Sequence, residues 1–298
     1  MTSVRSALSL CASAMRLHQW LKNLLIFVPL LVSHRLGTAG SLVAGIIAFV
    51  LFGLCASSAY VLNDLLDLAS DRQHPSKRRR PLAAGLMSVR AAVIAFPLLL
   101  LCAFSGALWL LPWQFAGAMA TYYVVTVAYS VLLKRLMIVD VVTLAMLYTL
   151  RIIAGTVLFH LVMTFWMLAF SMFIFLSLAL VKRHAELLDA RNKGDSDRPG
   201  GRGYYPGDLN MISSLGAASG YLSVMVLALY IQDPNTAALY RNPRIIWMAC
   251  PLLLYWISRT WMLTHRGEMH DDPVVFAIRD RVSLAVGGLF GLVFWLAV

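Results

Sequence analysis

The chain has 298 residues, of which 60% are hydrophobic and only 13% are charged. This composition excludes a soluble globular protein of this size and predicts an all-α, polytopic membrane protein. The formal net charge of +11 does not indicate nucleic acid as a partner, because the basic residues gather in the loops on one side of the predicted membrane spans.

Apolar stretches long enough to cross about 30 Å of hydrocarbon recur along the whole chain. They cover residues 41–62, 91–111, 114–133, 138–158, 163–181, 210–231, 243–264 and 278–297, and a weaker one covers 23–39. The weaker stretch has a short apolar core that contains Pro29. The sequence therefore predicts nine transmembrane helices in one domain over residues 1–298.

Basic residues lie mainly on one side of the predicted spans. With a cytoplasmic N-terminus, the outer loops hold Arg35, Arg241 and Arg244, and Arg151 lies within a span. The remaining Lys and Arg residues then fall at the inner surface, which is the positive-inside pattern. We therefore expect a cell (inner) membrane protein with a cytoplasmic N-terminus. A guanidinium inside a span, such as that of Arg151, is costly and should face a polar cavity or pair with an acid.

The segment at the start of the first span combines Trp20, Lys22 and Asn23. Trp20 at headgroup level and a Lys22 side chain that extends to the interface would anchor the chain in the membrane. The alternative is that Lys22 and Asn23 contact a substrate phosphate. The sequence leaves both interpretations open.

An acidic stretch follows the span at 41–62. Asn63 precedes Asp64, Asp67 and Asp71, and the spacing of i, i+3 and i+7 places the three carboxylates on one face of a helix. Such a cluster repels itself unless a cation holds it together, and hard oxygen ligands suit Mg²⁺ bridged to a diphosphate. The alternative is a solvated helix end whose acids pair with the basic residues behind them. We expect the metal–diphosphate site.

A basic tract follows the acids, with Lys77, Arg78, Arg79 and Arg80 directly before Pro81. A basic cytoplasmic loop usually serves only to set the topology. Here it lies within about a dozen residues of the proposed metal–diphosphate site, so some of its cations are candidates for neutralising phosphate oxygens.

A second charged loop covers residues 182–208, as the first covers residues 63–90. Lys182, Arg183, Glu186 and Arg191 lie on a predicted helix that extends out of the membrane, and the Gly-rich run at 192–207 predicts a mobile loop. Both loops are expected to be cytoplasmic and to form the two sides of one pocket. The charged residues at 268–281 are interpreted as a connecting loop that could border the same pocket.

The acidic and basic motifs together resemble the first signature of the UbiA-type intramembrane prenyltransferase superfamily. The matching residues are Asn63, Asp64, Asp67 and Asp71, followed by Arg78, Arg80 and Pro81. The resemblance covers essentially the whole chain. It implies nine transmembrane helices bundled around a cytoplasm-facing cavity that binds Mg²⁺ and a diphosphate.

Four features are similar to the decaprenyl-phosphate phosphoribosyltransferase branch of this superfamily. They are Gln19-Trp20-x-Lys22-Asn23, the run from Asp71 to Gly85, Lys182-Arg183-x-Ala185-Glu186-Leu187, and Ile278-Arg279-Asp280-Arg281-Val282. The second loop departs from the DxxxD motif of members with aromatic acceptors, since it offers Lys182, Arg183, Glu186 and Asp189 instead. The branch implies phosphoribosyl diphosphate as the donor and a polyprenyl phosphate as the acceptor. These substrates bring three anionic groups and therefore need more cations than a single diphosphate does. The Lys and Arg residues of the two charged loops could supply them.

The predicted reaction moves a 5-phosphoribosyl group to the polyprenyl phosphate and releases diphosphate. We assign Mg²⁺ binding to Asp64, Asp67 and Asp71. We assign catalysis to Asn63, Asp64, Asp67, Lys182 and Glu186. We assign substrate binding to Lys22, Asn23, Lys77, Arg78, Arg80, Arg183 and Arg191.

Two other functions remain open at this point. One is Mg²⁺-dependent transfer of a polyprenyl group from its diphosphate to an aromatic or other small acceptor. The other is a transporter or lipid flippase, which is disfavoured because nearly all acids lie on one side of the membrane. The sequence does not determine the polyprenyl length, and it leaves open whether the protein forms a homo-oligomer.

Overall fold

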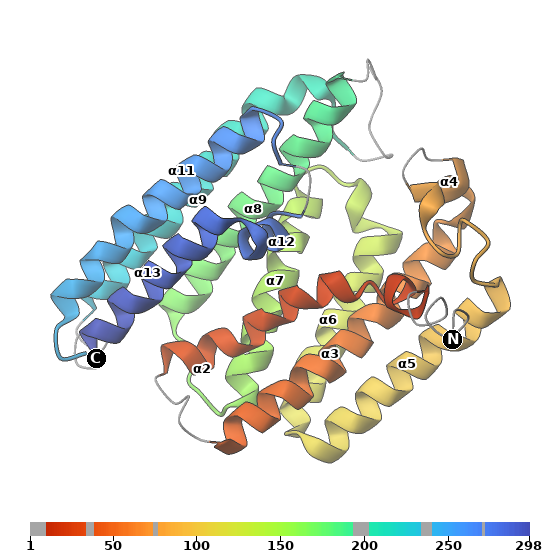
Figure 1. The fold of residues 1–298 in the computed structure, drawn as a ribbon, viewed down its shortest axis with the longest axis horizontal. Helices are drawn as coiled ribbons and strands as arrows, with labels where there is room; N and C mark the ends of the chain where they lie inside the picture. Colours follow the sequence, from red (N-terminus) through yellow and green to blue (C-terminus); the bar gives the residue numbers. More distant parts are fainter. Residues whose placement is uncertain (1–9, 34–38, 74–76, 193–202, 234–239, 270–271) are drawn as a thin grey trace. The chain divides into compact units, whose positions relative to one another are not determined.

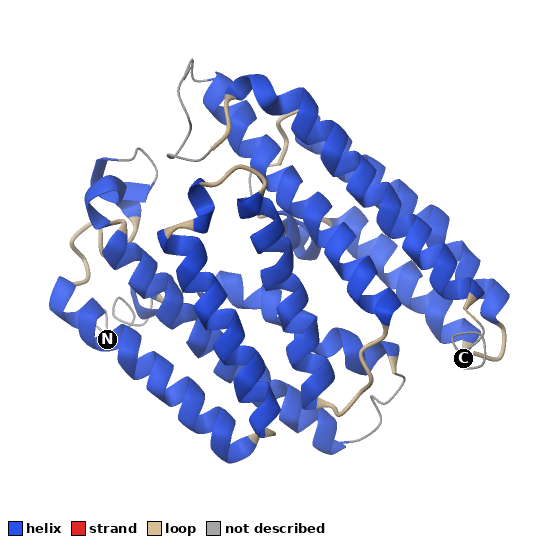
Figure 2. Ribbon diagram, turned by 180° about the vertical axis from the view of Figure 1, so that it is seen from behind, coloured by secondary structure: helices blue, strands red, loops and turns tan. Residues whose placement is uncertain are grey.

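The computed structural model describes residues 10–33, 39–73, 77–192, 203–233, 240–269 and 272–298, and the regular elements of this part of the chain are all helices (Figures 1 and 2). The longer helices are α3 (Ala39–Leu66), α5 (Val89–Leu110), α6 (Trp113–Val131), α7 (Val139–Leu158), α8 (Phe165–Asn192), α9 (Leu209–Gln232), α11 (Ala249–His265) and α13 (Arg281–Ala297). The shorter ones are η1 (Leu17–Phe27), α2 (Val28–Val32), α4 (Leu68–Gln73), η2 (Lys77–Arg79), η3 (Leu133–Arg135), η5 (Pro206–Asp208), η6 (Pro243–Met248) and α12 (Pro273–Arg279). The Gly-rich segment predicted to be mobile falls mostly on residues 193–202, outside the described residues.

The all-α prediction is confirmed, because each predicted apolar stretch coincides largely with helix. Among the described residues, five helices are long and apolar enough to cross a membrane. A sixth span results if α12 and α13, which meet at a bend of 81°, count as one. The chain is therefore an integral membrane protein, and the number of nine spans stays a prediction.

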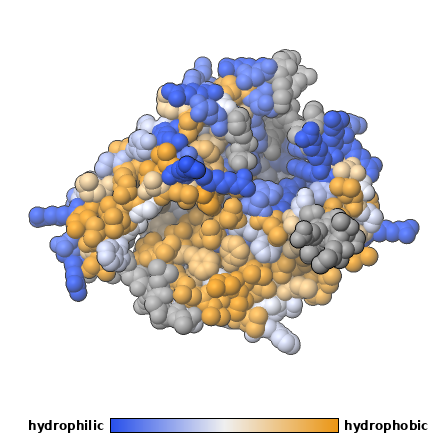
Figure 3. Space-filling model, in the orientation of Figure 1, coloured by the Kyte–Doolittle hydropathy of each residue, from blue (hydrophilic) through white to orange (hydrophobic). Residues whose placement is uncertain are grey.

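Lipid-exposed character is clearest on α5. Only 17% of the residues in an apolar 18-residue stretch of this helix are buried. Trp109 and Leu101 are 90% and 65% exposed. Apolar side chains of this kind are stable in contact with acyl chains but not with water. Figure 3 shows hydrophobic residues over much of the visible face, as expected for a surface that contacts lipid.

The chain divides into two compact units, and the first comprises Met1–Leu132 and Leu150–Val162. In this unit α3 packs against α5, η1 and α6. The centre of the Phe52 ring lies 6.3 Å from that of Phe115 and 4.6 Å from that of Tyr122, and all three residues are buried. Aromatic rings at these distances fill the space between α3 and α6 and stabilise their contact.

A glycine allows α7 to approach η1 closely within the first unit. A β-carbon at Gly155 would lie 2.0 Å from the Ile26 carbonyl oxygen. Because this neighbour is backbone, no side-chain rotation could relieve the overlap. Small residues at helix contacts allow such close approach in membranes, and here the contact fixes the segment that carries Lys22 and Asn23.

The second unit comprises Leu133–Thr149 and Met163–Val298. Its main contact is between α8 and α9, and α11 packs against both. Gly216 on α9 leaves room for the Trp261 indole, whose Nε1 donates a hydrogen bond of 3.1 Å to Ser177 Oγ. This packing holds the α8 segment that carries Lys182 and Glu186.

Two helix boundaries differ from the expected spans. The first acidic stretch is divided between α3 and α4, with Asp67 at the break. The expected span at 278–297 starts in α12 and continues in α13, because Asp280 accepts a hydrogen bond of 2.8 Å from the Ser283 amide and so caps a new helix.

Candidate functional site

Two acidic residues and two arginines form the Asp64 cluster, which lies in the first unit. Asp64 Oδ1 accepts hydrogen bonds from Arg16 Nη2 at 2.5 Å and from Arg80 Nη1 at 3.1 Å. Arg80 Nη1 also donates to Asp71 Oδ2 at 2.5 Å. The pairing with following basic residues that the sequence left open is therefore present, and it involves Arg80.

The turn after Arg80 is fixed by an apolar contact. Leu82 is buried against Val61 of α3 and Ala92 of α5, and Gly85 continues the turn at φ +73°, a conformation that suits glycine. The anchored turn holds Arg80 beside α3. As a result, Asp64 of α3, Asp71 of α4 and Arg80 of the turn after η2 meet.

Arg16 is the member of this cluster that was not predicted from the sequence. Its backbone is left-handed, with φ 51° and ψ 51°, and its guanidinium lies 5.1 Å from the centre of the Tyr60 ring. A non-glycine residue in this region is strained by about 1–2 kcal/mol. The contacts with Asp64 and Tyr60 offset that strain, and the conformation directs Arg16 to the acid.

The carboxylates of the Asp64 cluster are the candidate ligands for a divalent cation. Among the residues that the structure describes, no three acidic, histidine or cysteine side chains converge closely enough to hold a metal. Arg80 Nη1 nevertheless occupies a cation position shared by two carboxylates. Asp71 Oδ1 is in addition buried and makes no hydrogen bond with any described residue. Carboxylate oxygens with a spare acceptor fit Mg²⁺, and Asp64 and Asp71 would hold it.

The other predicted residues of the first loop lie around this cluster. Asn63 and Asp67 are half-buried, Lys77 is half-buried and Arg78 is exposed. Asp64 also borders a narrow, mostly apolar cleft whose lining includes Leu82 and Met87. The predicted metal-binding role of Asp67 and the predicted roles of Asn63, Lys77 and Arg78 stay predictions.

Asn23 and Arg151 form a separate buried contact in the first unit. Arg151 Nε donates to Asn23 Oδ1 at 3.2 Å, and Arg151 Nη2 donates to the Tyr122 hydroxyl at 2.9 Å. Asn23 and Lys22 are both buried. Arg151 thus contacts an amide and a phenol, whereas the polar cavity or acidic partner expected for it, and substrate contact by Lys22 and Asn23, stay predictions.

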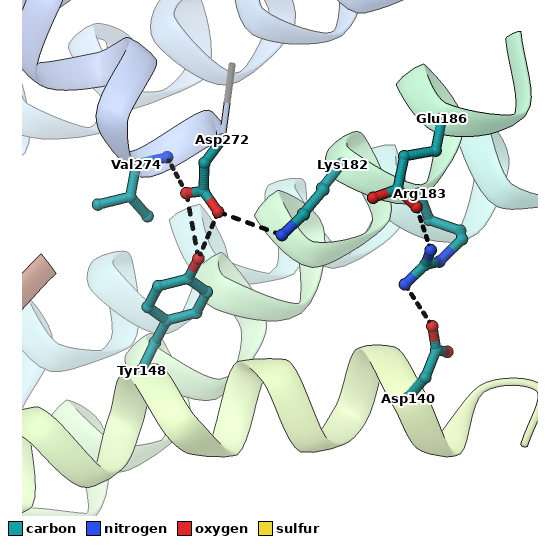
Figure 4. A network of polar contacts seen from close by, with 7 residues as sticks. All are labelled: Asp140, Tyr148, Lys182, Arg183, Glu186, Asp272 and Val274. Carbon is teal, nitrogen blue, oxygen red and sulfur yellow. Dashed lines mark hydrogen bonds and ion pairs between the residues drawn. The ribbon is translucent and has the colours of Figure 1, made fainter. Parts of the chain in front are cut away.

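The second unit contains the Arg183 cluster, formed by Asp140, Arg183, Glu186 and Tyr204, and Figure 4 shows the first three of these residues. Arg183 Nη2 lies 2.5 Å from Asp140 Oδ2, and Arg183 Nη1 donates to Glu186 Oε2 one turn along α8. The Tyr204 hydroxyl donates to Asp140 Oδ1 at 2.5 Å and accepts from the Ile138 amide at 2.7 Å. Burial, together with the hydrogen bond to Asp140, raises the pKa of the Tyr204 phenol.

Burial distinguishes the members of the Arg183 cluster. Arg183 is 1% exposed and Asp140 is fully buried, so each charge depends on the other for compensation. Glu186 is 37% exposed and can reach solvent or a ligand. Substrate binding by Arg183 and Glu186 stays a prediction, and Glu186 is the more accessible of the two.

Lys182 belongs to a third group, the Lys182 cluster, with Tyr148 and Asp272 (Figure 4). Lys182 Nζ lies 3.4 Å from Asp272 Oδ2. The Tyr148 hydroxyl donates to Asp272 Oδ1 and Oδ2 at 3.2 and 3.3 Å. Arg191, the remaining predicted residue, is exposed near the end of α8.

Four members of these groups were not predicted from the sequence, namely Tyr148, Asp272, Asp140 and Tyr204. One signal was available, because an acid at the start of a span, such as Asp140, requires a partner. The identity of that partner was not readable, since Tyr204 and Arg183 are distant in the chain. The residues at 268–281 were expected to form a connecting loop, and Asp272 in that segment contacts Lys182.

Together these features define an integral membrane protein whose described elements are all helices, with clusters of charged side chains on several of them. The chain belongs to the UbiA prenyltransferase family, whose model matches residues 24–285. It is thus a membrane transferase of the UbiA type, as the motifs at 63–81 predicted.

Three relatives show the range of proteins that the chain is similar to. The y4nM protein of Sinorhizobium fredii is 40% identical over 96% of this chain, which spans 55% of the length of y4nM. The nodulation protein NoeC of Azorhizobium caulinodans is 37% identical over 94% of this chain and 91% of its own length. The decaprenyl-phosphate phosphoribosyltransferase of Mycobacterium tuberculosis is 30% identical over 90% of this chain and 87% of its own length.

Solved structures show the same fold. A UbiA homolog from Archaeoglobus fulgidus bound to DMAPP and Mg²⁺ matches with a TM-score of 0.69 at 16% identity, over 96% of this chain and 98% of that one. Digeranylgeranylglyceryl phosphate synthase matches with a TM-score of 0.65 at 14% identity, over 97% of this chain and 98% of that one.

Proposed function

We propose that the protein transfers a 5-phosphoribosyl group from phosphoribosyl diphosphate to a polyprenyl phosphate and releases diphosphate. The observation that carries this proposal is the Asp64 cluster, in which Asp64 and Asp71 share the Arg80 guanidinium. The similarity to decaprenyl-phosphate phosphoribosyltransferases at 30% identity supports the donor and acceptor. The names of the relatives y4nM and NoeC do not state a substrate.

The first unit supplies the groups for the diphosphate. Asp64 and Asp71, with Asp67 as a further ligand, would hold Mg²⁺, and Asn63 would orient these carboxylates. When bound, Mg²⁺ supplies a Lewis acid that neutralises negative charge on the departing diphosphate. Arg80 lies between the two carboxylates and Arg16 contacts Asp64, so both guanidiniums are available for the same anion.

The second unit supplies groups for the remaining anionic parts of the substrates. Lys182 is one-third exposed and Glu186 slightly more so. They lie four residues apart and therefore on the same face of α8. We assign the phosphate of the sugar or lipid to Lys182 and the ribose hydroxyls to Glu186. Arg183 would hold Glu186 in place through their ion pair.

The proposed chemistry needs no strong general base. The bond between the anomeric carbon and the diphosphate oxygen breaks, and the acceptor phosphate forms the new bond to that carbon from the opposite face. A phosphate monoester is already anionic at neutral pH, so its oxygen is a competent nucleophile. The chain's residues therefore act by binding, orienting and neutralising the reacting groups.

Transfer from a prenyl diphosphate is the competing reaction, since the Asp64 cluster suits any diphosphate. Membranes from cells that produce the protein are incubated with Mg²⁺ and either radiolabelled phosphoribosyl diphosphate or a radiolabelled polyprenyl diphosphate. We expect label from the first donor to enter the lipid fraction in amounts well above those in membranes without the protein. Label from the second donor in a small acceptor, with none from the first in lipid, would contradict the proposal.

A further inference from the structure

Asp272 lies beside Lys182, although ninety residues separate them in the chain. Its side chain is only 6% exposed, so its charge requires donors within the protein. Donors to this carboxylate include the Tyr148 hydroxyl, the Lys182 ammonium and the Val274 amide, which donates at 3.2 Å where Asp272 caps α12.

These three donors differ in their freedom to move. The Val274 amide is part of the α12 backbone, and Tyr148 is 6% exposed with its ring 5.2 Å from that of Phe175. Lys182 is 33% exposed and has a long flexible stem. Its 3.4 Å contact is also longer than the 2.7–2.9 Å typical of charge-assisted hydrogen bonds.

This difference allows Lys182 to exchange partners. The ammonium can exchange its 3.4 Å contact with Asp272 for an incoming phosphate without breaking a short hydrogen bond to that carboxylate. Asp272 then keeps the Tyr148 hydroxyl and the Val274 amide, so its buried carboxylate is not left unsatisfied. The cost of leaving a buried acceptor without donors is thereby avoided.

We propose that Asp272 and Tyr148 are positioning residues that hold the Lys182 ammonium ready for the phosphorylated substrate. Asp272 restricts the lysine stem before binding, and Tyr148 fixes the carboxylate that restricts it. The inference rests on the proposed function in one respect, namely that Lys182 binds a substrate phosphate. It adds Asp272, the N-cap residue of α12, to the groups that determine substrate affinity.

Asp272→Asn is the variant that separates positioning from helix capping. The asparagine carbonyl can still accept from Tyr148 and Val274, and asparagine is as good an N-cap as aspartate, so the loss is mainly that of charge. We expect the KM for phosphoribosyl diphosphate to rise about threefold to tenfold, with kcat within about twofold, because binding must now order the Lys182 stem.

A double-mutant cycle identifies Lys182 as the residue through which Asp272 acts. In a Lys182→Met background, Asp272→Asn should produce no further rise in KM. Tyr148→Phe should raise KM in the same direction, also only when Lys182 is present. Additive effects, or an unchanged KM in Asp272→Asn and Tyr148→Phe, would overturn the proposal.

A chemical readout distinguishes failure of this inference from failure of the proposed function. Acetylation of Lys182 is followed by peptide mass spectrometry, with Lys134 as the internal reference. Loss of the Asp272 charge removes this ion pair from the Lys182 amine, so Asp272→Asn should accelerate acetylation of Lys182 about threefold and leave Lys134 unchanged. An unchanged Lys182 rate refutes the inference whatever donor the enzyme uses. If Asp272→Asn does not fold, Tyr148→Phe is tested in the same way.

Discussion

Asp64 and Asp71 carry the central prediction at the residue scale. Replacing either by asparagine keeps the size of the side chain and removes one of the two charges that share Arg80. We expect the transfer rate to fall about 10²- to 10³-fold, as when a preorganised electrostatic group is removed. Initial rates of purified variants, compared at matched amounts of monodisperse protein, measure this effect.

Asp233→Asn is the matched control for these variants. Asp233 also ends a long helix and accepts a hydrogen bond, from Trp166 Nε1 at 2.8 Å. Asparagine retains this acceptor, so we expect an activity close to that of the unmodified protein. Equal rates for Asp64→Asn, Asp71→Asn and Asp233→Asn would exclude the Asp64 cluster as the diphosphate site.

The charged side chains also show which residue contacts the sequence could predict. The spacing of Asp64, Asp71 and Arg80 indicated a common site, because all three lie within one short segment. Arg16 joins them from 48 residues away, and a left-handed backbone at that position has no signature in the residue type. A local pattern predicts local contacts, whereas Arg16 reaches Asp64 only through the packing of η1 on α3.

Helix contacts through glycine allow a test at the scale of elements. Gly155→Ala places a β-carbon against the Ile26 carbonyl, and overpacking of this kind typically costs about 1–3 kcal/mol. Gly287→Ala on α13 is the control, because nothing lies within 4 Å of the added carbon there. Thermal unfolding in detergent should show a lower midpoint for Gly155→Ala and an unchanged or higher one for Gly287→Ala. Equal midpoints would mean that α7 does not approach η1 as described.

Helix positions were more predictable than helix ends. Apolar stretches identify helices because each must satisfy its backbone internally in lipid. The bend of 81° between α12 and α13 was not predicted, although Asp272 before Pro273 is a typical helix start. Hydropathy does not record a change of direction inside an apolar segment. The capping interactions of Asp272 and Asp280 produce this change, and they depend on side-chain geometry.

At the scale of the whole molecule, composition determined the class of protein and the motifs determined the family. The hydrophobic fraction required a membrane, and the match over residues 24–285 established the UbiA fold. The composition of each charged cluster, in contrast, depends on several residues that are distant in the chain. The partners of Arg183 and Lys182 come from α7 and from the segments before α9 and α12, and no single stretch of sequence contains them.

The most direct test of the account follows diphosphate release by the purified protein as Mg²⁺ is titrated. The reaction contains phosphoribosyl diphosphate and a polyprenyl phosphate, and the lipid product is quantified by mass spectrometry. We predict one diphosphate released for each phosphoribosylated lipid formed, with both products lost in excess chelator. Formation of this lipid at an undiminished rate in excess chelator, or no such lipid at any Mg²⁺ concentration, would contradict the account.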